Sequence, residues 1–230
     1  APQKTMRIAQ QLYEGVNIKG QGTVGLITYL RTDSTRISVE ADAAAKEYIK
    51  EAYGAEFVGA GTVAKKDDKK VQDAHEAIRP TYMTNSPASI KDELSRDQFR
   101  LYQLIWNRFM ASRMAPAKYE NTSVKIAAGD YRFNASASKI AFDGFLSVYN
   151  INNEKSEGNV MLKSIDEDTK LTLNDLEPKQ HFTQPPAHYT EASLVKTLEE
   201  FGIGRPSTYA PTISTITARR YVVKEKKNLY

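Results

Sequence analysis

The sequence predicts an α+β protein with helical segments towards both ends and antiparallel strands between them. Three observations support this class. Apolar residues recur with helical spacing in residues 5–15, 38–54 and 95–116. In residues 119–149 the spacing changes to alternation, which is typical of strands. After residue 189 the helical spacing returns.

The N-terminal part predicts a helix, a strand and a second helix. Residues 5–15 carry apolar side chains at helical spacing and end in glycine, and residues 23–30 are a strand rich in β-branched residues. Ser38 is placed to cap the second helix and Gly54 to end it. The polar residues 59–74 are expected to form a loop.

A third helix is predicted from a capping box and one apolar stripe. Ser95 and Gln98 have the spacing at which each side chain bonds the backbone N–H of the other residue. Pro116 closes the segment. The stripe is expected to be core and consists of Phe99, Tyr102, Ile105, Trp106, Phe109 and Met110.

The middle of the chain predicts an antiparallel sheet. Residues 119–149 supply alternating strands around a turn at residues 128–131, and residues 170–178 add a further strand. Residues 152–159 are expected to be a hairpin loop.

The C-terminal part predicts a helix, a tight turn, a second helix and a hairpin. Thr190 caps a helix that runs to Gly202, and residues 207–221 form the next helix in spite of Pro211. Residues 222–230 begin a hairpin. This order is that of a winged helix-turn-helix, a common nucleic-acid reader, although many such arrangements bind nothing.

The net charge of +4 is distributed unevenly along the chain. Residues 1–118 carry a net charge of +4, residues 119–180 of −3 and residues 181–230 of +3. Basic segments favour a polyanionic partner, because each neutralised phosphate releases counterions. An ordinary solvated surface has the same composition, and charge alone favours that interpretation.

The composition excludes several classes of protein. Without cysteine there are no disulfides, thiol chemistry or cysteine zinc sites, and the three histidines are too far apart in sequence to suggest a zinc site. No apolar run reaches the length of a membrane span and no leader is present, so we expect a soluble cytoplasmic protein without a membrane partner. Because the chain begins without methionine and stops inside a predicted hairpin, we expect a piece of a longer protein.

Tyr29 is the first candidate catalytic residue. If residues 24–31 are extended, Tyr29 and Arg31 point to one face and Leu30 to the other. A phenol oxygen can attack phosphorus while a guanidinium holds the phosphate, and a phenol with a pKa of about 10 remains a fair leaving group. A structural tyrosine, with Arg31 and Asp33 in a surface ion pair, explains these residues at least as well.

Two further clusters suit phosphate. His75 and Arg79 stand four residues apart, so on one helical turn they would share a face and grip a phosphate together. Ser207 and Thr208 stand where a helix begins, where backbone N–H groups attract phosphate, and Arg205 precedes them. Taken singly, a core histidine and a simple helix cap explain these clusters better.

A D-x-D pattern suggests a third kind of site. Asp166 and Asp168 have the spacing of a Mg²⁺ pair, but no other ligand pattern lies near them in the sequence. A solvated loop is the better interpretation.

Taken together, the motifs resemble one family. GLITYLRTDSTRIS, HEAIRPT and GIGRPSTYAPTISTI, in this order and at this separation, are similar to bacterial DNA topoisomerase I of the type IA family. AQQLYEG, LYQLIWNRFMASRMAPAKY, FDGF and HFTQPPAHYTEASLVKTLEEFG fit the same family. The resemblance covers nearly the whole chain, and relatives of the topoisomerase III kind fit these motifs less well.

The resemblance implies roles for individual residues. Tyr29 corresponds to the nucleophile that forms a 5′-phosphotyrosine bond with one DNA strand, and Arg31 to the arginine that stabilises the scissile phosphate. Asp33 corresponds to a residue near the active-site interface and His75 to a histidine that lines the nucleotide site. Arg220 departs from the family, which usually has glycine before YV. Further DNA contacts are implied for Arg205, Ser207, Thr208 and Arg219.

The resemblance also implies an architecture and a partner. Within the family's toroid, residues 1–118 correspond to the tyrosine-bearing gate domain and residues 119–180 to the second half of a β-rich arch. Residues 181–230 correspond to the start of a helical domain that guides single-stranded DNA. The full-length enzyme is implied to be a monomeric isomerase that relaxes negatively supercoiled DNA.

Part of the family's active site is expected to lie outside these residues. The resemblance assigns Mg²⁺ and a catalytic glutamate to a Toprim domain, which precedes the matching segment, so we expect this chain alone not to relax DNA. A non-enzymatic winged-helix DNA-binding module remains the alternative, and in it Tyr29→Phe changes nothing. A purely structural domain is a third class, without salt-dependent affinity for single-stranded DNA.

Overall fold

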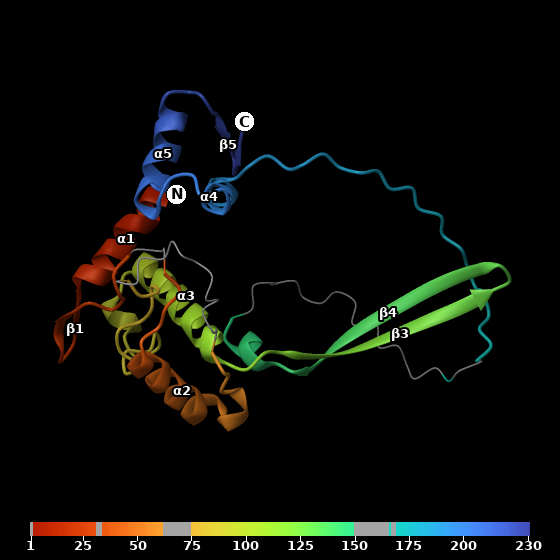
Figure 1. Ribbon diagram of the computed structural model, residues 1–230, viewed down its shortest axis with the longest axis horizontal. Helices are drawn as coiled ribbons and strands as arrows, with labels where there is room; N and C mark the ends of the chain where they lie inside the picture. Colours follow the sequence, from red (N-terminus) through yellow and green to blue (C-terminus); the bar gives the residue numbers. More distant parts are fainter. Residues whose placement is uncertain (1, 31–33, 62–74, 150–165, 167–168) are drawn as a thin grey trace. The chain divides into compact units, whose positions relative to one another are not determined.

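The computed structural model describes residues 2–30, 34–61, 75–149, 166 and 169–230 and confirms the α+β class (Figure 1). The described helices are α1 (Pro2–Glu14), α2 (Val39–Tyr53), α3 (Arg96–Arg113), α4 (Glu191–Glu200) and α5 (Pro206–Ala218). The described strands form antiparallel pairs: β1 (Val16–Ile18) with β2 (Gly22–Val24), β3 (Lys118–Ala128) with β4 (Tyr131–Phe142), and β5 (Lys224–Glu225) with β6 (Asn228–Leu229). Residues 1–115 with 187–230 form one compact unit, and residues 116–186 form another.

The helices of the first unit begin and end at the predicted caps. The Ser38 hydroxyl accepts a hydrogen bond from the backbone at the start of α2, and Gly54 ends that helix with a φ of 116°. At α3 the Ser95 hydroxyl accepts from the Gln98 N–H, and the Gln98 side chain accepts from the Ser95 N–H. The predicted capping box is therefore confirmed.

The core of the first unit forms mainly from one face of α3. The predicted apolar stripe supplies its buried residues Tyr102, Trp106, Phe109 and Met110. Leu12 of α1 and Ile49 of α2 are fully buried as well. The Tyr102 phenol donates to the backbone carbonyl of Asn85 at 2.6 Å. Burial raises the pKa of Tyr102, so the phenol stays protonated and keeps this bond.

A buried arginine links α2 to α3. Arg113 is 5% exposed, and its guanidinium donates to an Asp42 carboxylate oxygen at 2.9 Å. The Lys46 ammonium contacts the other oxygen at 2.7 Å. Burial by itself raises the pKa of Asp42, but the hydrogen bonds from Lys46 and Arg113 bring it below its ordinary value of 3.8. The folded state therefore favours the ionised carboxylate.

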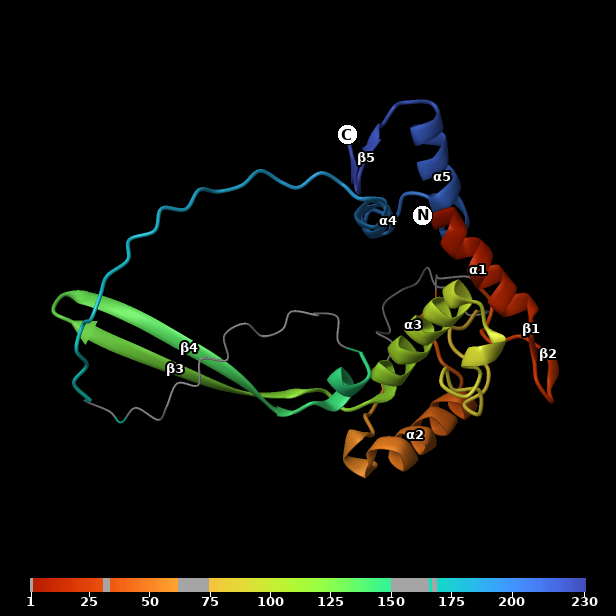
Figure 2. The same ribbon diagram turned by 180° about the vertical axis from the view of Figure 1, so that it is seen from behind.

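The second unit is a two-stranded ribbon. β3 and β4 pair along their length, with Ala128 opposite Tyr131 at the turn (Figure 1). Apolar pairs such as Ile126–Phe133 share one face, yet Phe133 is 46% and Tyr131 74% exposed. Among the described residues of this unit only Gly144 is buried. Figure 2 shows the ribbon from behind, where no described helix of the same unit covers it either.

Two parts of the expected sheet are wrong. Gly144–Ser147 form a short 3₁₀ helix after β4, because Gly144 takes a φ of 51° and turns the chain. Residues 170–178 form no strand: they are exposed throughout and do not pair with β3 or β4, although the ribbon has two open edges. The expected loop at residues 152–159 lies outside the described residues, as does most of the loop at 59–74. The predicted domain boundaries at residues 118 and 180 stay a prediction.

The C-terminal residues have the predicted order of helix, turn, helix and hairpin. The Thr190 hydroxyl accepts from the backbone in the first turn of α4, and Pro211 lies within α5. The Lys224 ammonium contacts the Glu191 carboxylate at 2.7 Å, which ties β5 to the start of α4. None of the described helices is long and apolar enough to cross a membrane.

Candidate active site

Two motifs that are about fifty residues apart in sequence pair through their backbones. The Thr28 N–H donates to the Arg79 carbonyl at 2.9 Å, and the Thr81 N–H donates to the Leu26 carbonyl at 3.1 Å. Ile27 and Pro80 face each other as an isolated antiparallel bridge. Residues 26–28 of the motif GLITYLRTDS and residues 79–81 of the motif HEAIRPT therefore pair directly. Neither motif predicts this contact from its own sequence.

Two threonine hydroxyls reinforce this pairing. The Thr28 hydroxyl donates to the Ala77 carbonyl at 2.8 Å and accepts from the Arg79 N–H at 3.0 Å. The Thr81 hydroxyl donates to the Gly25 carbonyl at 2.6 Å. Each bond joins one motif to the other, so the backbone that carries Tyr29 is fixed on both sides.

The predicted strand over residues 23–30 is shorter than expected. Regular pairing ends at Val24, where β2 ends, and only the bridge at Ile27 continues it. The reason is the close approach of helix α1: the Leu26 N–H donates to the Leu12 carbonyl at 2.8 Å. A Cβ at Gly25 would lie 2.7 Å from the Tyr13 carbonyl oxygen, so this approach requires glycine.

On this segment, the Tyr29 ring contacts two aromatic rings from other parts of the chain, those of Tyr13 and His75. It is 54% exposed, whereas Ile27 is buried. The Tyr13 ring meets the Tyr29 ring at 5.4 Å between centroids and 63° between planes, an edge contact. The His75 ring stacks on Tyr29 at 5.8 Å and 28°. The structure thus brings two of the predicted site residues, Tyr29 and His75, into contact.

The Nδ1 atom of His75 is buried and has no hydrogen-bond partner among the described residues. The alternative that His75 is an ordinary core histidine, with both ring nitrogens hydrogen-bonded, is therefore wrong.

The expected helical turn that joins His75 to Arg79 is wrong. Residues 75–79 are not helical, because Arg79 and Thr81 pair with the Tyr29 segment and Pro80 disfavours helix at the residue before it. The Arg79 guanidinium instead donates to the Glu76 carboxylate at 2.9 Å and to the Pro80 carbonyl at 2.9 Å. The helical arrangement predicted for His75 and Arg79 is thus not formed, and their binding of phosphate stays a prediction.

The second predicted cluster lies at the start of α5. Arg205 precedes the helix, and Ser207 and Thr208 occupy its first turn with exposed side chains. The Thr208 hydroxyl accepts from the Arg205 N–H at 2.9 Å, while the Arg205 guanidinium donates to the Gly204 carbonyl at 2.7 Å. Arg219 lies exposed at the opposite end of the helix. Three of the four predicted contacts thus share one helix terminus.

Other predicted residues have no such setting. Arg31, Asp33 and Asp168 lie outside the described residues, and Asp166 is exposed. Across residues 2–30, 34–61, 75–149, 166 and 169–230, no three His, Cys, Asp or Glu side chains gather into a group that could hold a metal ion.

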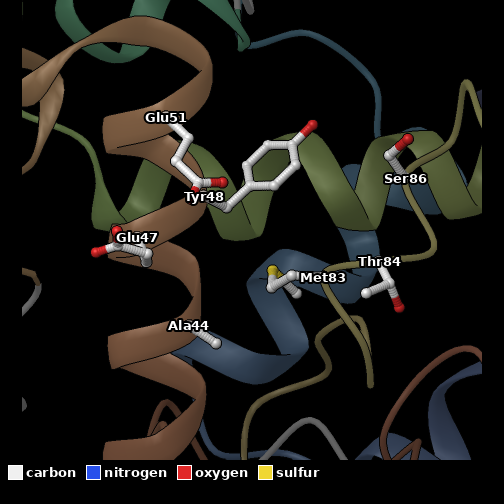
Figure 3. A pocket seen from close by; sticks show the side chains of 7 residues that line it. All are labelled: Ala44, Glu47, Tyr48, Glu51, Met83, Thr84 and Ser86. Atoms are coloured by element: carbon white, nitrogen blue, oxygen red, sulfur yellow. The ribbon is translucent and has the colours of Figure 1, made fainter.

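An open pocket of about 490 Å³ lies elsewhere, between α2 and residues 83–86 (Figure 3). Tyr48 and Glu51 line it from the helix, and Met83 and Ser86 line it from the loop. None of the predicted site residues contributes to it, so the pocket is separate from the site at Tyr29.

Three residues of the site were missed from sequence: Gly25 and Thr28, which fix the backbone, and Tyr13, which meets the nucleophile candidate. Tyr13 lies in the helix predicted over residues 5–15, where it counts as one of the apolar side chains at helical spacing. The available signal was its place in AQQLYEG, a motif that occurs with the others, but helical spacing carries no information on contacts between segments.

Comparison with known proteins gives the class of the molecule. The family model described as DNA topoisomerase matches residues 1–230. The chain therefore belongs to the DNA topoisomerase family, and the resemblance to the bacterial type IA enzymes is confirmed.

A solved structure gives a particular relative. The chain is similar to full-length topoisomerase I from Thermotoga maritima in a monoclinic crystal form, with 39% sequence identity and a TM-score of 0.75. The match covers 99% of this chain and 36% of that chain, so the chain spans little more than a third of the length of this relative.

Proposed function

We propose that this chain carries the nucleophile of a type IA DNA topoisomerase, and that the nucleophile is Tyr29. The observation that supports this most is the placement of Tyr29: an exposed phenol on a backbone fixed by two motifs, against the ring of His75. A tyrosine with a purely structural role does not require an exposed phenol, whereas a nucleophile must be accessible to the DNA.

The proposed reaction exchanges one phosphodiester bond for another. The Tyr29 oxygen attacks the phosphorus of one DNA strand and loses its proton, and the bond from phosphorus to the 3′ oxygen breaks. The products are a 5′-phosphotyrosine and a 3′-hydroxyl, which takes up a proton. After passage of the other strand the 3′-hydroxyl loses its proton and attacks the phosphorus, the bond from phosphorus to the Tyr29 oxygen breaks, and Tyr29 takes up a proton as the strand is resealed. The result is relaxation of negative supercoils without hydrolysis.

We assign the surrounding residues to phosphate and DNA binding. By the family resemblance, we assign Arg31 to the charge on the scissile phosphate, Asp33 to the active-site interface and His75 to the nucleotide site. The first turn of α5 binds the backbone of single-stranded DNA through Arg205, Ser207, Thr208 and, further along, Arg219. Because the DNA is cytoplasmic in bacteria, we place the reaction there, in a monomeric enzyme.

The complete reaction is proposed for a longer protein. This chain spans 36% of the Thermotoga relative, and the family resemblance assigns Mg²⁺ and the general acid to a Toprim domain. We therefore expect the 230 residues alone not to relax plasmid DNA. Mg²⁺-dependent relaxation by this chain alone would contradict that expectation.

The test is an adduct assay in the full-length protein. Labelled single-stranded DNA is mixed with wild type, Tyr29→Phe and Tyr82→Phe, and SDS-stable complexes are counted. Tyr82 is a matched control, since it is 57% exposed and Tyr29 is 54% exposed. We expect adducts from wild type and Tyr82→Phe and none from Tyr29→Phe. An undiminished adduct from Tyr29→Phe would refute the assignment.

The order α4, turn, α5 and hairpin also fits a non-enzymatic winged-helix DNA-binding module. That function predicts salt-dependent DNA binding without any covalent adduct from the full-length protein.

A further inference from the structure

Tyr13 contacts the proposed nucleophile Tyr29 but has no part in the proposed reaction. It lies in the last turn of α1 and is 38% exposed, so it is not needed to fill the core. Its ring nevertheless meets the Tyr29 ring edge-on, at 5.4 Å and 63°. The His75 ring contacts Tyr29 in a different geometry, stacked at 28°.

The position of Tyr13 is fixed by the same backbone that carries Tyr29. The neighbouring Leu12 carbonyl accepts from the Leu26 N–H at 2.8 Å. Gly25 passes so close to the Tyr13 carbonyl that a Cβ there would lie 2.7 Å from its oxygen. A hydrogen bond and a close backbone contact therefore hold the end of α1 against the segment that carries Tyr29.

Besides the stacked His75 ring, the Tyr29 side chain has little else to fix its direction. No described residue hydrogen-bonds to its hydroxyl, and more than half of its surface is exposed. A tyrosine side chain with few contacts populates more than one of the staggered χ1 rotamers. In-line attack on phosphorus needs one of them, with the phenol oxygen near the phosphorus.

We propose that Tyr13 is a positioning residue for Tyr29: its ring edge holds the Tyr29 side chain in the rotamer that attacks the DNA phosphate. The proposal rests on the proposed function of Tyr29 as the nucleophile. Edge-to-face aromatic contacts are strong enough to bias a rotamer by about 3- to 10-fold. Phenylalanine at position 13 keeps the ring edge, whereas leucine does not.

The test measures single-turnover cleavage of labelled single-stranded DNA by the full-length enzyme, with binding measured separately. We expect Tyr13→Leu to cleave about 3- to 10-fold more slowly with unchanged affinity for uncleaved DNA, and Tyr13→Phe to cleave at close to the wild-type rate. Religation from the covalent state is expected to slow in the same way, because the same rotamer is used.

Tyr53 provides a matched control. It lies in the last turn of α2, is 36% exposed and contacts the Phe57 ring, so like Tyr13 it is a partly exposed tyrosine with an aromatic neighbour at a helix end. Tyr53→Leu is expected to leave the cleavage rate unchanged. If Tyr13→Leu lowers the melting temperature, Tyr13→Gln replaces it with the same expectation, since glutamine suits an exposed helical position.

The outcomes separate the two proposals. Wild-type cleavage by Tyr13→Leu and Tyr13→Gln, with no adduct from Tyr29→Phe, would refute the positioning role and leave the nucleophile in place. An equal loss of rate in Tyr13→Phe and Tyr13→Leu, or a loss of DNA affinity that accounts for the slower cleavage, would also refute positioning. An adduct from Tyr29→Phe would refute the nucleophile and the positioning role with it.

Discussion

The unit that carries Tyr29 and the β3–β4 ribbon both place apolar side chains on one face, with opposite results. In the first, an apolar stripe on α3 is buried against other segments, and Tyr102 is 0% exposed. In the second, alternating apolar residues satisfy their backbone by pairing with each other, and Tyr131 remains 74% exposed. Periodicity thus predicts which side chains share a face, but only contacts between distant segments decide whether that face is buried.

The same difference separates the two predicted phosphate sites. Tyr29 owes its position to bonds with residues about fifty positions away, such as that from Thr28 to Arg79. The cluster of Arg205 and Thr208 is organised within a single helix turn. Substitutions that break long-range bonds are therefore expected to have larger effects than those that break local ones.

Truncation of a core tyrosine and of a ribbon tyrosine gives the largest contrast. Tyr102→Ala removes a buried ring and its hydrogen bond to Asn85, so we expect a loss of about 3–5 kcal/mol in the free energy of unfolding. Tyr131→Ala is expected to change it by less than about 0.5 kcal/mol. Urea unfolding of the full chain measures both, and equal losses would show that the ribbon is buried as well.

Removal of the Thr28 hydroxyl tests the bond between the motifs. Thr28→Val keeps the shape of the side chain but loses the hydrogen bonds to Ala77 and Arg79. We expect this to lower the free energy of unfolding, measured by urea unfolding, by about 2–3 kcal/mol. Thr122→Val, on the exposed ribbon, is the control and is expected to be close to neutral. A neutral Thr28→Val would mean that backbone pairing alone holds the Tyr29 segment.

Asp42 gives the first unit a dependence on acid. Its pKa is lower in the folded state than its ordinary value of 3.8, so its stabilising effect is complete above that value and is lost as the pH falls through the folded-state pKa. Asp42→Asn should remove about 1 kcal/mol near neutral pH and leave a shallower decline between pH about 5 and 3.

Asp97 is the control for this titration. A hydrogen bond from Lys4 also lowers the pKa of Asp97, but this pair is exposed at the surface. Asp97→Asn is expected to leave the acid decline unchanged within error. Parallel declines for wild type and Asp42→Asn would show that the Arg113 pair does not stabilise the fold.

The smallest effect concerns a single backbone position after α5. Arg220 has a φ of 58°, a conformation that favours glycine, and the family resemblance implies glycine at this position. Arg220→Gly is expected to raise the free energy of unfolding by about 0.5 kcal/mol, and Arg219→Gly to lower it by a similar amount. A loss of stability from Arg220→Gly would show that its side chain makes a compensating contact.

What the sequence predicted well was local. Ser38, Ser95 and Thr190 cap their helices as expected, because a cap needs only its own first turn. Residues 170–178 were wrongly predicted as a strand, because a strand depends on a partner that the segment itself does not specify.

The candidate site divides in the same way. Tyr29 and His75 were identified from their motifs, and their contact was not, because spacing within HEAIRPT suggested a helical turn that Pro80 and the pairing with Thr28 prevent. Tyr13 was missed for a related reason: its exposed ring matters only through a neighbour on another segment.

The most direct test of the central claim is to locate the covalent bond itself. Full-length protein is trapped on labelled single-stranded DNA with SDS, digested with nuclease and protease, and the nucleotide-bearing peptide is identified by mass spectrometry. The account predicts a single modified residue, Tyr29, linked through a 5′ phosphate. A nucleotide on any other side chain, such as Tyr13, or a 3′ linkage would contradict it.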